Sequence, residues 1–188
     1  NQVLVKPYGA EAMKFDSVFM ACHSDQALKM LVDHTRDESN ILGSIPYQRN
    51  EAILHTDTNV LPKKRLAWAA WNYHILKENQ DRVALTYNMN ILQNIKSKHT
   101  FCVTLNNTDA IDPKKIIKRI DYDHPMFTLK GMAAQSQQER INGPRNTYFC
   151  GAYWRNGFHE DGVVSALNAI EHFKRTQANE KLHLHRAS

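Results

Sequence analysis

Four strand-like runs in the middle of the chain constrain the fold more than any other feature. Each run mixes apolar and polar residues, and turn-rich joins separate neighbouring runs. The runs cover residues 47–55, 65–73, 83–90 and 99–105, with joins at 57–59, 77–81 and 96–98. Short joins favour antiparallel pairing, and the mixed composition predicts a sheet with one buried face. Residues 116–122 fit a fifth strand.

The stretch before this sheet combines strands with a helix. Residues 2–6, a turn at 7–9 and a run at 15–22 predict a hairpin. The second strand is continuously apolar, which is typical of a strand buried on both faces in an α/β sheet. Ser24 is the expected cap of the helix that follows, in which apolar residues recur at helical spacing.

The stretch after the sheet again combines a predicted strand with predicted helices. Residues 131–141 predict a polar helix, and residues 147–150 predict a short apolar strand. A helix is expected from Asp161, with a frayed tail from Thr176. The expected buried stripe of this last helix consists of Val163, Val164, Leu167, Ile170 and Phe173.

Together these patterns predict a mixed α/β chain of the α+β class. Residues 1–44 and 126–178 are assigned to one α/β layer, residues 45–125 to the antiparallel sheet and residues 179–188 to a tail. The chain opens at Asn1, without a methionine, and runs directly into a strand. We therefore expect it to be a piece of a larger protein.

Composition and charge argue against several classes of protein. The apolar runs are far shorter than the roughly 20 residues that a membrane helix needs, and no secretion signal is evident. Three cysteines, each in an apolar run, fit a reducing compartment and predict a cytoplasmic protein. The net charge of +5 comes from short basic groups spread between acids, so we expect no nucleic-acid partner.

The junction between the last strand and the last helix carries the strongest functional signal. The strand ends at Cys150-Gly151, and the helix starts at Glu160-Asp161-Gly162. A helix start offers unpaired amides and a partial positive charge, which suit an anion or an electron-rich carbonyl. Gly162 would let a flat ligand approach the backbone closely. The alternative is an ordinary helix cap in which Asp161 or Glu160 satisfies the first turn.

The segment NTYFCGAYWRNGFHEDGVVSALNAI resembles the C-terminal flavin-binding signature of the flavin-containing amine oxidase and phytoene desaturase-like superfamily. Gly151-Ala152 match the strand end of that signature, and Asp161-Gly162-Val163 match its helix start. FDSVFMACHSDQAL, IPYQRNEAILHTDTNVLPKKRLAWAAWNY and GAYWRNGFHEDGVVSAL together resemble one bacterial branch. These are predicted NAD/FAD-binding proteins, often called FAD-dependent amine oxidase-like, and the likeness spans about residues 3–173.

The resemblance implies an FAD-dependent oxidoreductase that transfers a hydride from an organic substrate to the flavin. It implies that Gly162, Val163 and Val164 lie against the isoalloxazine ring, near its N1/C2=O edge. Gly151 and Ala152 would lie near the ribityl and pyrophosphate groups, and Phe158 and His159 would approach the ring. The substrate would be a small organic or lipid-like molecule, since amine, carotenoid-like and lipid substrates all fit the superfamily.

One departure from the superfamily limits this interpretation. The Gly-x-Gly-x-x-Gly loop that receives the FAD pyrophosphate is absent, as is the ribose-binding acid. The chain has seven glycines, none in that spacing. We therefore expect a C-terminal portion whose partner is the missing N-terminal dinucleotide-binding portion of the same protein. Alone, the fragment is expected to be inactive and to bind FAD weakly or not at all.

Polar and aromatic residues in the expected sheet are candidates for a substrate pocket. Trp68 and Trp71 are three residues apart, so on a regular strand they would face opposite sides. Ordinary sheet packing is the alternative for each candidate. The predicted pocket residues are Trp71, Asn72, Tyr87 and Asn90.

His55 and Asp57 are two residues apart, so a strand would place them on one face. Such a pair suits a metal or a general base with its orienting acid. No third ligand is evident, so a hydrogen-bonded strand end is the preferred interpretation and no metal is predicted. His183 and His185 fall in the expected tail. Neither Gly-x-Ser-x-Gly nor Cys-x-x-Cys occurs, which argues against a serine hydrolase and a disulfide oxidoreductase.

Three functions therefore remain open from the sequence. The first is a fragment of an FAD-dependent oxidoreductase. The second is a non-catalytic α+β module that binds a ligand or a protein. The third is a metal-dependent hydrolase that uses His55 and Asp57. The oligomeric state and the catalytic residues are not specified by any motif.

Overall fold

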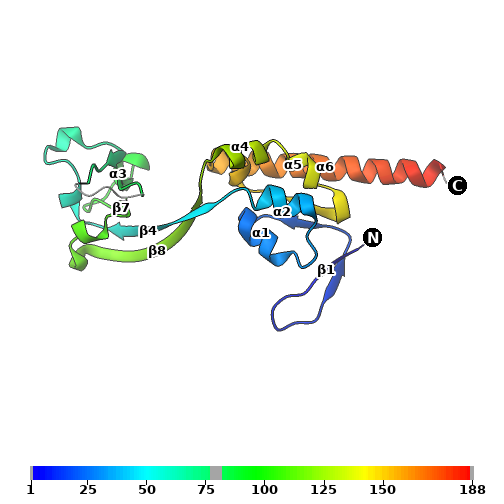
Figure 1. Cartoon of the computed structure of the whole chain (residues 1–188). Coiled ribbons are helices and arrows are strands. Elements are labelled where there is room, and N and C mark those ends of the chain that lie inside the picture. The colour runs from blue at the N-terminus through cyan, green and yellow to red at the C-terminus, as the bar shows by residue number, and fades with distance from the viewer. Residues whose placement is uncertain (1, 77–81, 187–188) are drawn as a thin grey trace. The chain divides into compact units, whose positions relative to one another are not determined.

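The computed structural model describes residues 2–76 and 82–186, and the side chains up to residue 179. The chain forms two compact units (Figure 1). One contains Asn1–Tyr47 and Pro125–Ser188, and the other contains Gln48–His124. The fold is mixed α+β, as predicted, with an antiparallel sheet and a long C-terminal helix. No helix in the described ranges is long and apolar enough to cross a membrane.

A five-stranded antiparallel sheet organises the second unit. Its spatial order is β5 (Trp71–Tyr73), β6 (Leu85–Asn88), β7 (Cys102–Leu105), β4 (Tyr47–His55) and β8 (Ile116–Pro125). Within the sheet, Ile53 lies opposite Thr104, and Thr104 lies opposite Thr86. The expected fifth strand is present as β8, and β4 has the predicted boundaries.

Three expected strands are shorter than predicted: the run at 99–105 forms β7 only from Cys102 onward, and in the other two local interactions fold part of the run. Residues Arg65–Ala67 form a 3-10 turn instead of the start of β5. Trp68 follows that turn, and its indole Nε1 donates to the carbonyl of Pro62 at 2.8 Å. The run at 83–90 ends in α3 (Met89–Leu92), because the side chain of Asn88 accepts the amide of Ile91. The expected join at 77–81 lies outside the described residues.

The other unit is built on a parallel pair of strands. β3 (Val18–Met20) pairs with β9 (Thr147–Phe149), and Met20 lies opposite Phe149. The expected hairpin is present, but its second strand is β2 (Met13–Phe15), which pairs with β1 (Val3–Val5).

The prediction that this strand is buried on both faces is wrong. Phe19 is 40% exposed. Its ring stacks on Tyr148 at 4.9 Å and meets Phe173 edge-on at 5.7 Å, so the contacts come from one side. The strand therefore has one covered face and one face that the described residues cover only in part.

Short helices cover the opposite side of this strand pair. They are α1 (Ser24–Met30), α2 (Arg36–Leu42), α4 (Leu129–Gln135) and α5 (Gln138–Ile141). Their core includes Ala27, Leu42, Ile141 and Phe149. His23, not Ser24, is the cap of α1, and its backbone amide donates to Gln26 Oε1 at 3.2 Å. The single helix expected at 131–141 is two helices.

The last helix, α6 (His159–Arg186), differs from its prediction at both ends and in its face. It starts before Asp161 and continues through the range expected to be a tail. Val163 and Leu167 of the expected stripe are 53% and 60% exposed. Ser165 and Ala169 are buried instead, and Ala169 packs on Tyr148 and Cys150. Small residues form the packing face because they allow the helix to approach β9 closely.

Candidate functional site

The carboxyl ends of β3 and β9 lie together because the two strands are parallel. The amide of Cys150 donates to the carbonyl of Met20 at 3.1 Å, which extends the pairing to the ends of both strands. His23 and α1 follow one strand, and Gly151 and the turn before α6 follow the other. In sheets of parallel strands, ligands bind outside the carboxyl ends. This edge, which we call the strand-end site, is the candidate functional site.

Gly151 occupies a position that no other residue fits. A Cβ atom there would lie 2.5 Å from Cε1 of Tyr153 and 3.4 Å from the carbonyl oxygen of Cys22. The chain turns sharply at this point into a 3-10 turn, Ala152–Trp154. Tyr153 and Trp154 are both buried in the core beneath the turn. Gly151 is therefore explained by the packing of the chain itself.

The start of α6 is capped by an acidic side chain. Asp161 is buried, and its Oδ2 accepts the amide of Phe158 at 3.0 Å. Its Oδ1 lies 3.6 Å from Nε of Arg155. This arrangement is a form of the cap that the sequence left as an alternative, because an acidic side chain three positions into the helix satisfies the amide of the residue just before it, as in a capping box.

The amides that α6 leaves unpaired lie one turn before the residues expected to bind the flavin. The amide of Gly162 already donates to the carbonyl of Phe158 at 3.2 Å. An α-helix has no internal acceptor for the amides of its first turn, which here belong to His159, Glu160 and Asp161. These three amides, and not those of Gly162 to Val164, are the backbone donors at this helix start.

Gly162 has no packing explanation within the described chain. A Cβ atom at this position would meet nothing nearer than the backbone nitrogen of Ala152, at 4.0 Å. A glycine inside a helix costs about 1 kcal/mol relative to alanine. Gly131 in α4 is different, because a Cβ there would lie 3.2 Å from Oγ1 of Thr128 and 3.3 Å from the carbonyl oxygen of Ser44.

The remaining residues predicted to bind the cofactor fall into two groups. Ala152 and Val164 are half-buried, and Ala152 lies next to Gly162. Phe158, His159 and Val163 are exposed. The structure thus brings Gly151, Ala152, Asp161 and Gly162 together around the turn between β9 and α6.

Sequence reasoning missed the contribution of Tyr47, which belongs to the same unit, to the strand-end site. The hydroxyl of Tyr47 accepts the amide of Ser24 at 2.9 Å, and the Tyr47 ring stacks on His23 at 4.6 Å. Burial raises the pKa of Tyr47, although its hydrogen bonds to Ser24 oppose this. The Tyr47 hydroxyl therefore satisfies an amide in the first turn of α1. No sequence signal connected Tyr47 with Ser24, because the contact joins residues 23 positions apart.

Tyr153 is a second residue of this region that the sequence did not single out. Burial raises the pKa of its hydroxyl, and nearby Tyr47, Cys150 and Cys22 act in the same direction. The hydroxyl is therefore neutral at physiological pH. Its ring centroid lies 5.0 Å from that of Trp154, so the two aromatic residues pack together under the turn.

The four residues predicted to form a substrate pocket are not brought together. Trp71 and Tyr87 are cross-strand partners whose rings meet edge-on at 5.4 Å. Asn72 lies on the other face, where its Nδ2 donates to the carbonyl of Ala69 at 2.7 Å. Asn90 holds the loop after α3, because its Oδ1 accepts the amide of Phe101 at 2.7 Å.

His55 and Asp57 form a hydrogen-bonded strand end. Nδ1 of His55 accepts the backbone amide of Asp57 at 3.0 Å. The Asp57 carboxylate accepts the amides of Asn59 and Asp112, and Nζ of Lys115 lies 3.0 Å away. The donor atoms that a metal would use are thus already engaged. No group of three or more metal-binding side chains occurs among the described residues. The side chains of His183 and His185 lie outside the described part.

A hydrogen-bond chain of four side chains, three buried and one half-buried, crosses the sheet from His55. Nε2 of His55 lies 2.7 Å from Oγ1 of Thr104, which lies 2.7 Å from Oγ1 of Thr86, which lies 2.7 Å from Nε2 of His74. Because His55 Nδ1 accepts an amide, its Nε2 carries the hydrogen. Each threonine then accepts from one neighbour and donates to the next, and Nε2 of His74 accepts the last hydrogen bond. This arrangement requires both imidazoles to be neutral.

Burial lowers the pKa of both histidines in this chain. For His55, the carboxylate of Asp57 opposes burial without overcoming it. This hydrogen-bond chain therefore has a structural role, because it connects side chains from neighbouring strands of the sheet. Thr86, Thr104 and His74 were not singled out from the sequence, since threonines in strands are common and only their alignment across the sheet is informative.

The strand-end site thus combines one glycine that packing requires, one glycine that packing leaves unexplained, and three backbone amides at a helix start. The other unit has, within its sheet, hydrogen-bonded polar residues and one aromatic pair in which Trp71 is exposed and Tyr87 is half-buried. In comparisons with known proteins, the chain matches no protein-family model and no curated protein sequence.

Proposed function

We propose that this chain is the C-terminal portion of an FAD-dependent oxidoreductase of the amine oxidase-like type. The observation that carries the proposal is Gly162, a helical glycine at the strand-end site with no packing partner that demands it. A glycine kept at a cost in helix stability is explained if a ligand approaches the backbone there. The resemblance of the surrounding segment to a flavin-binding signature names the ligand.

The residues at the helix start fit the chemistry of a flavin. The amides of His159 to Asp161, together with the dipole of the long helix α6, favour negative charge and electron-rich carbonyl oxygens. The carboxylate of Asp161 is already paired with the Phe158 amide and Arg155, so its charge is partly compensated. When bound, FAD would accept a hydride from the substrate, while this chain would supply positioning and electrostatics.

The two units would then have different tasks. The unit with β3, β9 and α6 would hold the ring end of the flavin, and the missing N-terminal portion would bind the dinucleotide. The five-stranded sheet would belong to the substrate domain of a cytoplasmic enzyme that acts on a small organic or lipid-like molecule. Trp71, which is 56% exposed, and its half-buried partner Tyr87 are the sheet residues best suited to contact such a substrate.

Purification of the complete gene product tests this proposal. We expect a yellow protein with a flavin absorption spectrum, or a colourless protein that acquires this spectrum when FAD is added. A complete, folded product that remains colourless and does not bind FAD would contradict the proposal and favour the non-catalytic module.

A matched pair of variants connects FAD binding to Gly162. In the complete product, Gly162→Ala adds one methyl group where the ring is expected to lie, so the dissociation constant for FAD should rise on the order of tenfold. Asn168→Ala, at an exposed position of the same helix, should leave it unchanged. Equal FAD affinity in both variants would remove the role assigned to Gly162.

A further inference from the structure

Strand β8 is an edge of the five-stranded sheet. Its described neighbour is β4, and no described strand pairs with its other side (Figure 1). Seven of its ten positions are exposed and the other three are half-buried, and Ile117 and Tyr122 are about half exposed. A long open edge is a template for pairing with another strand, and proteins usually protect such edges with charges.

The charges on β8 change sign at the middle of the strand. Lys118 and Arg119 precede Ile120, and Asp121 and Asp123 follow it. Charges of one sign would repel a second copy of the same edge. A strand that is basic in its first half and acidic in its second half is instead complementary to itself when the second copy runs antiparallel.

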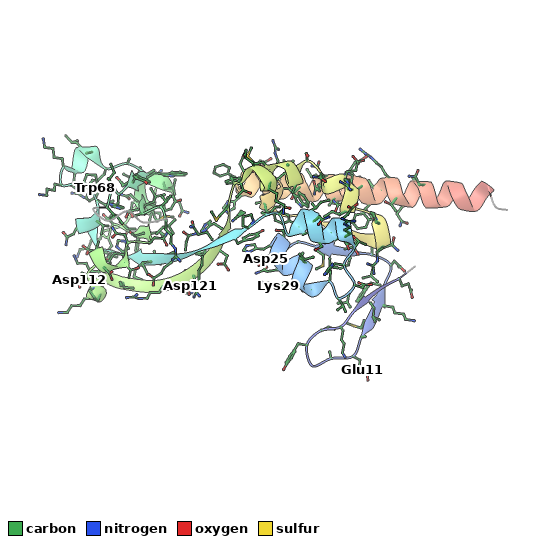
Figure 2. The ribbon with its side chains drawn as sticks, viewed as in Figure 1. Glu11, Asp25, Lys29, Trp68, Asp112 and Asp121 are labelled. Carbon is green, nitrogen blue, oxygen red and sulfur yellow. The ribbon has the colours of Figure 1, made fainter. Side chains whose placement is uncertain are left out.

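Two of these charges are already aligned by the neighbouring strand. Arg119 pairs with Glu51 of β4 at 3.4 Å, and Asp121 pairs with Arg49 of β4 at 2.6 Å. These side chains therefore share one face of the sheet, and Figure 2 shows Asp121 on β8. The side chains of Arg119 and Asp121 remain 55% and 57% exposed, so both are accessible to a partner.

We propose that two copies of this chain associate through β8, antiparallel, with a twofold axis between their Ile120 residues. Arg119 of each copy then lies opposite Asp121 of the other. The ion pairs within each copy extend this contact into a row of alternating charge across four strands, from Glu51 through Arg119 to Asp121 and Arg49 of the second copy. Lys118 lies opposite the ring of Tyr122, a favourable cation–π geometry.

The charges select this register over its neighbours. A twofold axis perpendicular to the sheet preserves the faces of the strand, so the register can shift only in steps that keep each side chain on its face. Centring the axis on Arg119 places two guanidinium groups opposite each other, and centring it on Asp121 places two carboxylates opposite each other. Like charges directly opposite destabilise a strand pair. The register centred on Ile120 has no such pair.

Sedimentation velocity of the 188-residue chain over a range of concentrations tests the dimer. We expect a monomer–dimer equilibrium that salt shifts toward the monomer, because the charged groups are exposed. Arg119→Asp puts carboxylates opposite each other, and Asp121→Arg puts guanidinium groups opposite each other. Each variant should raise the dimer dissociation constant at least tenfold, while Lys96→Asp, in the exposed loop after α3, should not change it.

Mixing the two β8 variants separates loss of pairing from loss of folding. In an equimolar mixture, every charged pair across the interface is again opposite in sign, so a heterodimer should form with near wild-type affinity. Circular dichroism melts check that each variant is folded. A wild-type chain that stays monomeric, a dimer insensitive to both variants and to salt, or folded variants that remain monomeric when mixed would overturn the proposal.

Discussion

The backbone amide of Gly151 donates a hydrogen bond to Oγ of Ser165 at 2.8 Å, and the same hydroxyl donates to the carbonyl of Gly162 at 3.0 Å. One side chain therefore connects the end of β9 to the first turns of α6. Ser165 is 1% exposed, so water does not replace either bond. The position of the helix start relative to the strand end depends on this hydroxyl.

Ser165→Ala removes the acceptor of the Gly151 amide and should destabilise the chain by about 1 kcal/mol, because a half-buried donor is left unpaired. Urea unfolding followed by circular dichroism measures this loss. Ser136→Ala is the control, since the exposed Ser136 hydroxyl bonds only to the Ala133 carbonyl of its own helix. Similar losses in both variants would show that the link between strand and helix contributes little.

Gly162→Ala and Gly131→Ala should have opposite effects on stability. At Gly162 the added methyl has space, so the better helix propensity of alanine should raise the free energy of unfolding by about 1 kcal/mol. At Gly131 the methyl would press on Thr128 and on the Ser44 backbone, so stability should fall. Thermal and urea unfolding of both variants provide the comparison. A loss at Gly162 would mean that the chain itself requires that glycine.

Local pattern was sufficient where a strand meets little competition from short-range bonds. β4 was predicted with its observed boundaries from a nine-residue run of mixed polar and apolar residues. The run that ends in β5 has the same texture, but its first half folds into a turn held by the Trp68–Pro62 hydrogen bond. Composition does not distinguish a full strand from a run that is half turn, since the outcome depends on which hydrogen-bond partner a side chain contacts.

The pairing of strands that lie far apart in the sequence could not be predicted from hydrophobic periodicity. Met20 and Cys150 meet at the strand-end site although they are 130 residues apart. The predicted buried face of α6 was wrong in part. Phe173 of the predicted stripe packs against Tyr148 and Ala169, but Val163 and Leu167 are exposed, because close approach to β9 requires the small side chains of Ser165 and Ala169.

The candidate site was predictable only where glycine and acidic residues mark a backbone feature. Gly151, Asp161 and Gly162 are visible in the sequence because their roles are local. Tyr47 and Ser165 were missed, since a tyrosine in a strand and a serine in a helix become informative only through their tertiary partners.

Asp57→Asn should destabilise the chain by about 2 kcal/mol. Burial alone would raise the pKa of Asp57, but the amides of Asp112 and Asn59 and the ammonium group of Lys115 outweigh it and hold this pKa below its ordinary value. The amide side chain keeps one acceptor and loses the charge that strengthens these bonds.

The measurement for Asp57 is urea unfolding near neutral pH, with Asp109→Asn at an exposed position as the control. Because the folded-state pKa of Asp57 is depressed, its contribution is present above the unfolded-state pKa and is lost as pH falls below it. The difference between wild type and Asp57→Asn should therefore shrink in acid. A difference that is the same at all pH values would contradict the charge argument.

Stability of the wild-type chain should fall as the pH drops below about 6.5, the ordinary pKa of histidine. Burial lowers the pKa of His74, His55 and His172 in the folded state. The unfolded chain then binds more protons than the folded chain in this range, so acid favours unfolding. Each histidine contributes a slope of at most about 1.4 kcal/mol per pH unit.

His74→Gln tests the part of this slope that belongs to the hydrogen-bond chain across the sheet. Glutamine retains an acceptor for the hydroxyl of Thr86 but does not titrate, so the free energy of unfolding should depend less steeply on pH between about 6.5 and 5. Thr86 donates to Nε2 only when His74 is neutral, so an unaltered slope in His74→Gln would show that Nε2 of His74 is not held as an acceptor and that the folded chain tolerates a charged imidazole there.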